Sequence, residues 1–208
     1  MNAATLRCTF SGPAGTLQGL RDLPPGPPRG TAVIAHPHPL FGGTMDNKVV
    51  QTLARAFVQC GWEAVRFNFR GVEASGGRFD EGFGETDDLL AVIAQAAPTG
   101  ALALAGFSFG AFVTARALAG DEVLARRPAK TILVGLAASR FHVPPLSQTL
   151  HEQTLVVHGE QDETVPLASV LDWARPQHLP VTVVPGVEHF FHGQLPLLRR
   201  LAVHHLQA

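Results

Sequence analysis

The 208-residue chain is predicted to adopt an α/β fold, with a mostly parallel, doubly wound sheet that begins with an antiparallel hairpin. Six short runs are almost continuously hydrophobic, which is typical of strands buried on both faces. Helical patterns lie between these runs, and such alternation favours right-handed βαβ units. Two earlier runs flank the Gly/Pro-rich turn Ser11-Gly12-Pro13-Ala14-Gly15, which indicates the hairpin.

The expected elements can be assigned in chain order. The hairpin strands are expected at residues 6–10 and 16–20, and the buried strands at 31–35, 64–68, 102–106, 130–135, 154–158 and 181–184. Helices are expected at 47–60, 85–97, 111–118, 166–175 and 195–206, mostly ending at or next to Gly or Pro. The Pro/Gly-rich stretch 20–30 is interpreted as a surface connection, so residues 1–208 are expected to form one domain.

Composition excludes several classes of function. The chain is 46% hydrophobic and 16% charged, with a formal net charge of −1 and no basic block, so we expect no nucleic-acid partner. The apolar runs are too short for a membrane span, and the first residues do not have the pattern of a signal peptide. Cys8 and Cys60 are expected to be reduced thiols. These features predict a cytoplasmic protein; they do not predict its oligomeric state.

The most informative motif is Gly106-Phe107-Ser108-Phe109-Gly110, which lies between a predicted strand and a predicted helix. In this context G-x-S-x-G indicates a nucleophile elbow, a strained turn that raises the serine hydroxyl above the sheet. Glycine is needed on both sides because other side chains would collide with neighbouring backbone. Ser108 is therefore the candidate nucleophile, although ordinary glycine-rich turns can show the same pattern.

Two further residues complete a candidate catalytic triad. Asp162 follows the strand expected at 154–158, and His189 follows the strand expected at 181–184. Because parallel strands end at the same edge of a sheet, both side chains are expected near Ser108. Their chain order, Ser, Asp, His, is the one used in this architecture. His189 would act as the general base, and Asp162 would orient it.

Four nearby residues are alternatives or neighbours of the triad. Glu160 and Glu163 are alternatives for the acid, but Glu163 is expected in the first turn of the next helix. His192 is an alternative base, but it lies further past its strand end and beside a glycine. His158 is expected to pack or to form a hydrogen bond at the end of its strand.

An oxyanion hole requires two backbone N–H donors. Phe109, the residue after the nucleophile, is the first candidate. The second lies in the loop His36-Pro37-His38-Pro39-Leu40-Phe41. Proline has no N–H, which leaves His38, Leu40 and Phe41, and His38 is preferred. The paired histidines also suggest a metal site, but no third ligand stands at a suitable spacing, so neither a metal nor a cofactor is expected.

The chain resembles small bacterial α/β-hydrolases that are similar to dienelactone-hydrolase-like esterases. The matching stretches are HPHPLFGGTMDNK (36–48), RFNFRG (66–71), GFSFG (106–110) and HGEQD (158–162), and the resemblance covers nearly the whole chain. It implies an α/β-hydrolase fold without a cap domain and the activity of a serine carboxylesterase. Dienelactone hydrolases proper have Cys where Ser108 stands. Relatives often carry Gly in place of Glu73, which implies a local difference in that loop.

The connection at residues 136–153 is also too short for a helical cap domain. A site left open in this way cannot enclose a long acyl chain, so small or short-chain esters are the expected substrates. Several aromatic residues are candidate walls of the site, although core packing would explain each of them as well. These are Phe41, Phe107, Phe109, Phe141, Phe190 and Phe191.

Other classes of function remain open from the sequence. A thioesterase or a peptidase would use the same triad, and a non-catalytic binding module would keep the fold without turnover. A nucleotide-binding domain, with residues 106–110 as its phosphate loop, is disfavoured because the sequence lacks G-x-G-x-x-G after the first strand and the acidic residue that should follow it.

Overall fold

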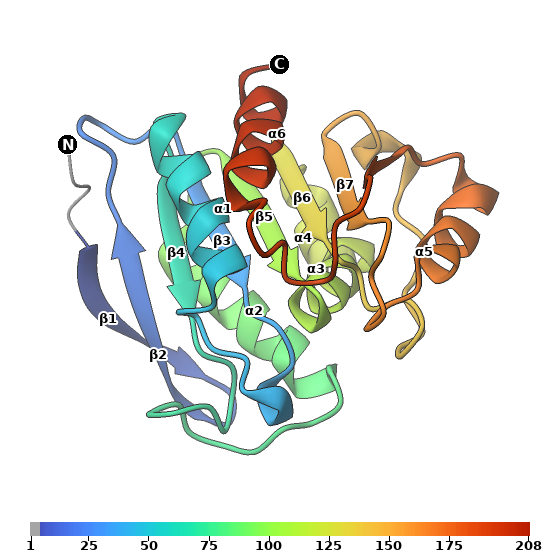
Figure 1. Ribbon diagram of the computed structural model, residues 1–208. Helices are drawn as coiled ribbons and strands as arrows, with labels where there is room; N and C mark the ends of the chain where they lie inside the picture. The colour runs from blue at the N-terminus through green and yellow to red at the C-terminus, as the bar shows by residue number, and fades with distance from the viewer. Residues whose placement is uncertain (1–4) are drawn as a thin grey trace.

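The computed structural model describes residues 5–208 and contains an eight-stranded sheet in the order β1-β2-β4-β3-β5-β6-β7-β8 (Figure 1). β1 (Thr5–Gly12) and β2 (Gly15–Asp22) are antiparallel, and β2 is also antiparallel to β4 (Glu63–Phe67). The remaining neighbours are parallel. These strands are β3 (Thr31–Ala35), β5 (Leu102–Phe107), β6 (Lys130–Val134), β7 (Thr154–Gly159) and β8 (Val181–Val184). The predicted fold class is confirmed.

Helices cover both faces of the sheet. α1 (Lys48–Gln59) and α6 (Leu195–Gln207) lie on the face turned toward the viewer in Figure 1. The other face is covered by α2 (Phe83–Ala96), α3 (Phe109–Ala119), α4 (Asp121–Arg126) and α5 (Leu167–Ala174). Short 3-10 helices are η1 (Pro39–Phe41), η2 (Gln148–Leu150) and η3 (Arg175–Gln177). Within residues 5–208, no helix has the length and apolar character needed to cross a membrane.

Strand β5 shows why the central runs are continuously hydrophobic. Leu102 and Leu104 pack in the core cluster that includes α2 and α3, whereas Ala103, Ala105 and Phe107 pack in the cluster that includes α1 and α6. Successive side chains of a strand point to opposite faces, so a sheet covered on both sides requires apolar residues at every position. The two cysteines pack against opposite clusters, and both are free thiols as predicted.

Three local details differ from the predictions. α4 was not predicted. β8 was expected to be buried on both faces, but three of its four residues are half-buried because it is the edge strand of the sheet. Glu163 was expected in a helix, but α5 begins only at Leu167, with Pro166 as its N-cap. The residue before a proline is disfavoured in helical conformation, which explains the later start.

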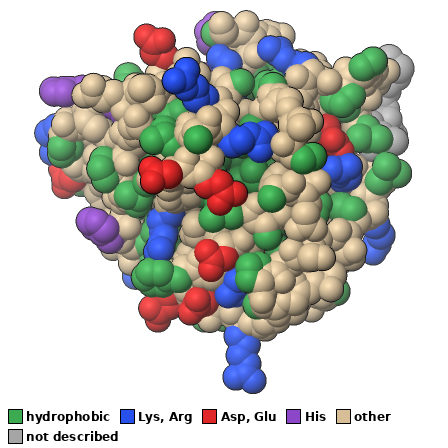
Figure 2. Space-filling view, turned by 180° about the vertical axis from the view of Figure 1, so that it is seen from behind, with side chains coloured by type: hydrophobic (Ala, Val, Ile, Leu, Met, Phe, Trp, Pro, Cys, Tyr) green, Lys and Arg blue, Asp and Glu red, His purple; other side chains and the backbone are tan. Residues whose placement is uncertain are grey.

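The segment between β6 and β7 contains η2 as its one helical element, so no cap domain stands over the carboxyl ends of the strands. The surface on the far side of the sheet carries acidic and basic side chains interspersed with one another (Figure 2). This mixed distribution agrees with the net charge of −1 and the lack of a basic block in the sequence.

Candidate active site

Ser108 lies in a strained turn between β5 and α3. Its φ of 57° and ψ of −115° place a non-glycine residue in a rarely populated region. Its N–H donates to the Val134 carbonyl at 2.8 Å, which ties the turn to β6. A Cβ at Gly106 would lie 2.3 Å from the Gly110 carbonyl, and a Cβ at Gly110 would lie 2.4 Å from the Ala35 carbonyl. The backbone therefore excludes larger residues at both glycines.

Three loops bring the hydroxyl, the imidazole and the carboxylate together. Ser108 Oγ lies 2.9 Å from His189 Nε2, and His189 Nδ1 lies 2.5 Å from Asp162 Oδ2. All three residues are buried. Asp162 Oδ1 also accepts the Val165 N–H at 2.7 Å, so both carboxylate oxygens are held. Asp162 Oδ2 can accept a hydrogen bond from the Nδ1–H of His189, which leaves Nε2 unprotonated and able to take the proton of Ser108.

The alternative acids and base are engaged elsewhere or exposed. Glu160 Oε2 accepts the Gly186 N–H at 2.8 Å, and the Glu163 residue is exposed. His192 is also exposed, and its Nδ1 pairs with Glu188 at 3.0 Å. Among the described residues, His189 is the only one whose side chain is hydrogen-bonded to the Ser108 hydroxyl.

Two backbone N–H groups are free beside the serine turn. Phe109 is the first residue of α3, and neither its N–H nor that of His38 has an acceptor among residues 5–208. The other loop candidates are occupied, since the Leu40 N–H donates to His38 Nδ1 at 3.2 Å and the Phe41 N–H donates to the His38 carbonyl at 3.1 Å. The rings of His38 and Phe109 lie 5.0 Å apart, so the two segments are neighbours.

His36 fixes the start of this loop from within the core. The residue is fully buried; its Nδ1 lies 2.6 Å from the Pro37 carbonyl and its Nε2 lies 3.0 Å from the Phe69 N. Because the Phe69 N–H can only donate, Nε2 must be unprotonated and the proton must lie on Nδ1. Burial lowers the pKa of His36 to about 4, so the ring is neutral near neutral pH.

The end of β4 and the residues after it anchor the far end of the same loop. Asn68 Oδ1 accepts the Met45 N–H at 2.8 Å, and Arg66 Nη1 donates to the Met45 carbonyl at 2.9 Å. Arg66 is held in turn by Asp22 at 2.8 Å. Glu73 adopts a left-handed conformation with φ 49°, which glycine adopts more easily, and its carboxylate accepts from Asn68 Nδ2 at 2.8 Å. The stretch RFNFRG thus supports the loop that carries His38.

Three residues surround the His189 ring, and of these Phe107 and Phe190 were predicted as walls of the site whereas Gly135 was not. Gly135, directly after β6, has φ 57°, and a Cβ there would lie 3.1 Å from His189 Cε1. The Phe107 ring lies 4.9 Å from the His189 ring, and the Phe190 ring lies 5.1 Å from it. The available signal for Gly135 was its place as a glycine at the end of the strand expected at 130–135, at the same sheet edge as Ser108.

The predicted aromatic walls divide into exposed and buried residues. Phe41 is 86% exposed and Phe190 is 41% exposed, so both offer surface near the site. Phe141 is partly buried, and its ring lies 6.0 Å from that of His38. Phe107 and Phe109 are fully buried beside the triad. Phe191 is fully buried in the core cluster that contains α6, so the alternative of core packing applies to it.

Comparison with known proteins gives the family. The structure superposes with a TM-score of 0.84 on XC6422 from Xanthomonas campestris, described as an α/β serine hydrolase without a lid; the two share 40% identity over 98% of this chain and 94% of that one. The chain belongs to the lidless α/β serine hydrolases. This hydrolase is also 38% identical to an α/β serine hydrolase homologue from Coxiella burnetii, with 96% of each chain covered and a TM-score of 0.82.

A further relative is known from Rickettsia prowazekii. The hydrolase is 30% identical to the uncharacterised protein RP471 of Rickettsia prowazekii, a match that covers 88% of this chain and 80% of the relative. No family model matches the chain.

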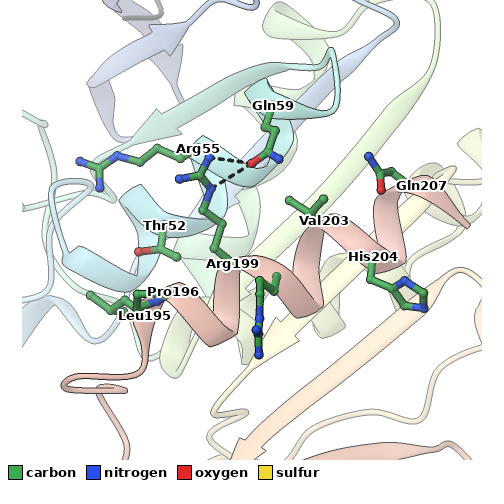
Figure 3. A pocket seen from close by; sticks show the side chains of 10 residues that line it. Thr52, Arg55, Gln59, Leu195, Pro196, Arg199, Val203, His204 and Gln207 are labelled. Carbon is green, nitrogen blue, oxygen red and sulfur yellow. Dashed lines mark hydrogen bonds between the residues drawn. The ribbon is translucent and has the colours of Figure 1, made fainter. Parts of the chain in front are cut away.

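A groove of about 590 Å³ lies away from the candidate triad of this hydrolase, between α1 and α6 (Figure 3). Arg55 and Gln59 come from α1, and Arg199 and His204 from α6; Arg199 donates to Gln59 Oε1 at 2.6 Å. None of the triad residues lines the groove, which contains no nucleophile beside a base. Within residues 5–208, no three His, Cys, Asp or Glu side chains are grouped as metal ligands.

Proposed function

We propose that this hydrolase is a carboxylesterase that cleaves small or short-chain esters through an acyl-enzyme on Ser108. The observation that carries the proposal is the hydrogen-bonded succession from Ser108 Oγ through the His189 ring to Asp162 Oδ2. The strained turn at Ser108 adds support, because strain of this kind is typical of a nucleophile elbow. The relatives described as serine hydrolases support the reaction class.

The proposed cycle is acyl transfer. His189 Nε2 takes the proton of Ser108 as the hydroxyl oxygen attacks the ester carbonyl. The N–H groups of Phe109 and His38 then donate to the oxyanion. Asp162 keeps the proton of His189 on Nδ1 and stabilises the imidazolium without being protonated itself. His189 returns its proton to the leaving alcohol, and a water molecule repeats the sequence on the acyl-enzyme.

The open surroundings of the triad support the preference for small esters. The β6–β7 segment holds no cap, so a long acyl chain would remain in water and gain little apolar contact. Phe41 and Phe190 supply exposed aromatic surface that suits a compact acyl or alcohol group.

A panel of p-nitrophenyl esters from acetate to dodecanoate tests the proposal. We expect kcat/KM to be highest for the shortest esters and to fall on the order of 10⁴–10⁶-fold in Ser108→Ala. Ser139→Ala, which changes an exposed serine of the β6–β7 segment, is the matched control and should keep full activity. Activity retained by Ser108→Ala would overturn the assignment of Ser108 as the nucleophile. A maximum at long chains, or a higher kcat/KM for matched thioesters or peptide amides, would overturn the substrate class.

A further inference from the structure

His158 is a buried histidine next to the triad that the mechanism above does not use. It lies in β7 and is fully buried. Its Nε2 lies 2.8 Å from the Val165 carbonyl and 3.4 Å from Asp162 Oδ2. The side chain therefore contacts the same short loop that presents Asp162 to His189.

The contacts of His158 determine its protonation state. The Val165 carbonyl can only accept, so Nε2 must carry the proton. Nδ1 is buried and has no hydrogen-bond partner among the described residues, so a second proton there would be an unsatisfied buried donor. Burial lowers the pKa of His158, and the ionisable groups that act on it are Asp162, on its own loop, and His189, from the loop after β8. The ring is a fixed neutral donor rather than a second base.

His158, Val165 and Asp162 form a closed set of contacts. The Val165 carbonyl accepts from His158, and the Val165 N–H donates to Asp162 Oδ1 at 2.7 Å. Asp162 Oδ2 lies close to both histidines: it is 2.5 Å from His189 Nδ1 and 3.4 Å from His158 Nε2. Without that donor, the Val165 carbonyl would be left unpaired and the turn that holds the carboxylate would lose its support from β7.

We propose that His158 is a positioning residue for catalysis: its ring N–H holds the 162–165 turn so that the Asp162 carboxylate meets His189 in the productive orientation. The inference rests on the proposed function. A carboxylate displaced by about 1 Å would stabilise the imidazolium less, and misplacement of this size costs about 100-fold in rate.

Three variants of His158 test the proposal on p-nitrophenyl acetate. His158→Leu removes the donor; its kcat/KM should fall about 10- to 100-fold with little change in KM. The acid limb of its kcat/KM profile, which reports the pKa of the general base, should move to lower pH. In His158→Gln the amide nitrogen can take the place of Nε2, so most activity should return. In His158→Asn the amide is too short to reach Val165, so activity should remain low.

The control is His205→Leu, which removes another histidine contact to a backbone carbonyl, between His205 Nε2 and the Gln153 oxygen at 3.0 Å, away from the triad. It should leave the acid limb unchanged. If His158→Leu does not fold, the activities of His158→Gln and His158→Asn are compared instead, and the inference requires the Gln variant to be the more active. A folded His158→Leu with the wild-type rate and pH profile, or equal activity of the Gln and Asn variants, would overturn the inference while leaving the esterase intact. An inactive wild-type chain that a fluorophosphonate does not label would overturn the proposed function and the inference together.

Discussion

Acidification should destabilise this hydrolase through His36. Its ring is neutral in the fold because burial lowers its pKa from 6.5 to about 4. In the unfolded chain the imidazole regains its ordinary pKa, so between these two values the unfolded state binds more protons than the native state. The contribution of neutral His36 to the free energy of unfolding is therefore fully present above the pKa of the unfolded chain. It is lost as the pH falls from that value to the pKa of His36 in the fold. At 1.36 kcal/mol per unit, the full loss is about 3 kcal/mol, of which about 2 kcal/mol is lost by about pH 5.

Urea unfolding at about pH 7 and about pH 5 measures this loss. The matched variant is His36→Gln, whose side-chain oxygen can accept the Phe69 N–H without titrating. Other groups titrate in both proteins, so the informative quantity is the difference between them. The wild-type free energy of unfolding should fall by about 2 kcal/mol more than that of the variant. An equal fall in both proteins would refute the assignment of a neutral, buried His36.

Three further predictions concern the site. Gly135→Ala adds a Cβ 3.1 Å from His189 Cε1, so kcat/KM on p-nitrophenyl acetate should fall about 10- to 100-fold; an unchanged value would show that the ring tolerates the contact. Gly110→Ala should lower the free energy of urea unfolding by about 1–3 kcal/mol, because its Cβ would lie 2.4 Å from the Ala35 carbonyl oxygen. The control Gly120→Ala should lower it less, because the nearest atom to its Cβ is 3.3 Å away. Asp162→Asn should lower kcat about 10⁴-fold, and a smaller loss than that of Gly135→Ala would contradict its role.

Much of the fold was predictable because the central strands are buried on both faces. β3 coincides with its prediction, and β5 is one residue longer than predicted. The short helix α4 was missed because its six residues bury only Val123, which leaves no periodic pattern. The half-buried state of β8 follows from its place at the sheet edge, and a pattern along the chain contains no information about neighbours in space.

The candidate triad was predictable because its geometry is set by local features. The glycines around Ser108 are required by backbone contacts within a few ångströms, and Asp162 and His189 each follow a recognisable strand. The contacts that support the triad were not predictable to the same degree. Gly135 meets His189 across 54 residues of chain, and His36 meets Phe69 across 33. Such pairs depend on which strands are neighbours.

In the proposed mechanism, His189 activates Ser108 by taking the proton of its hydroxyl. Incubation with a fluorophosphonate, followed by peptide mass spectrometry, tests it directly. We expect a single adduct per chain, located on Ser108 in the wild-type protein and absent from folded His189→Ala. An adduct on another residue, or equal labelling of Ser108 in His189→Ala, would contradict it.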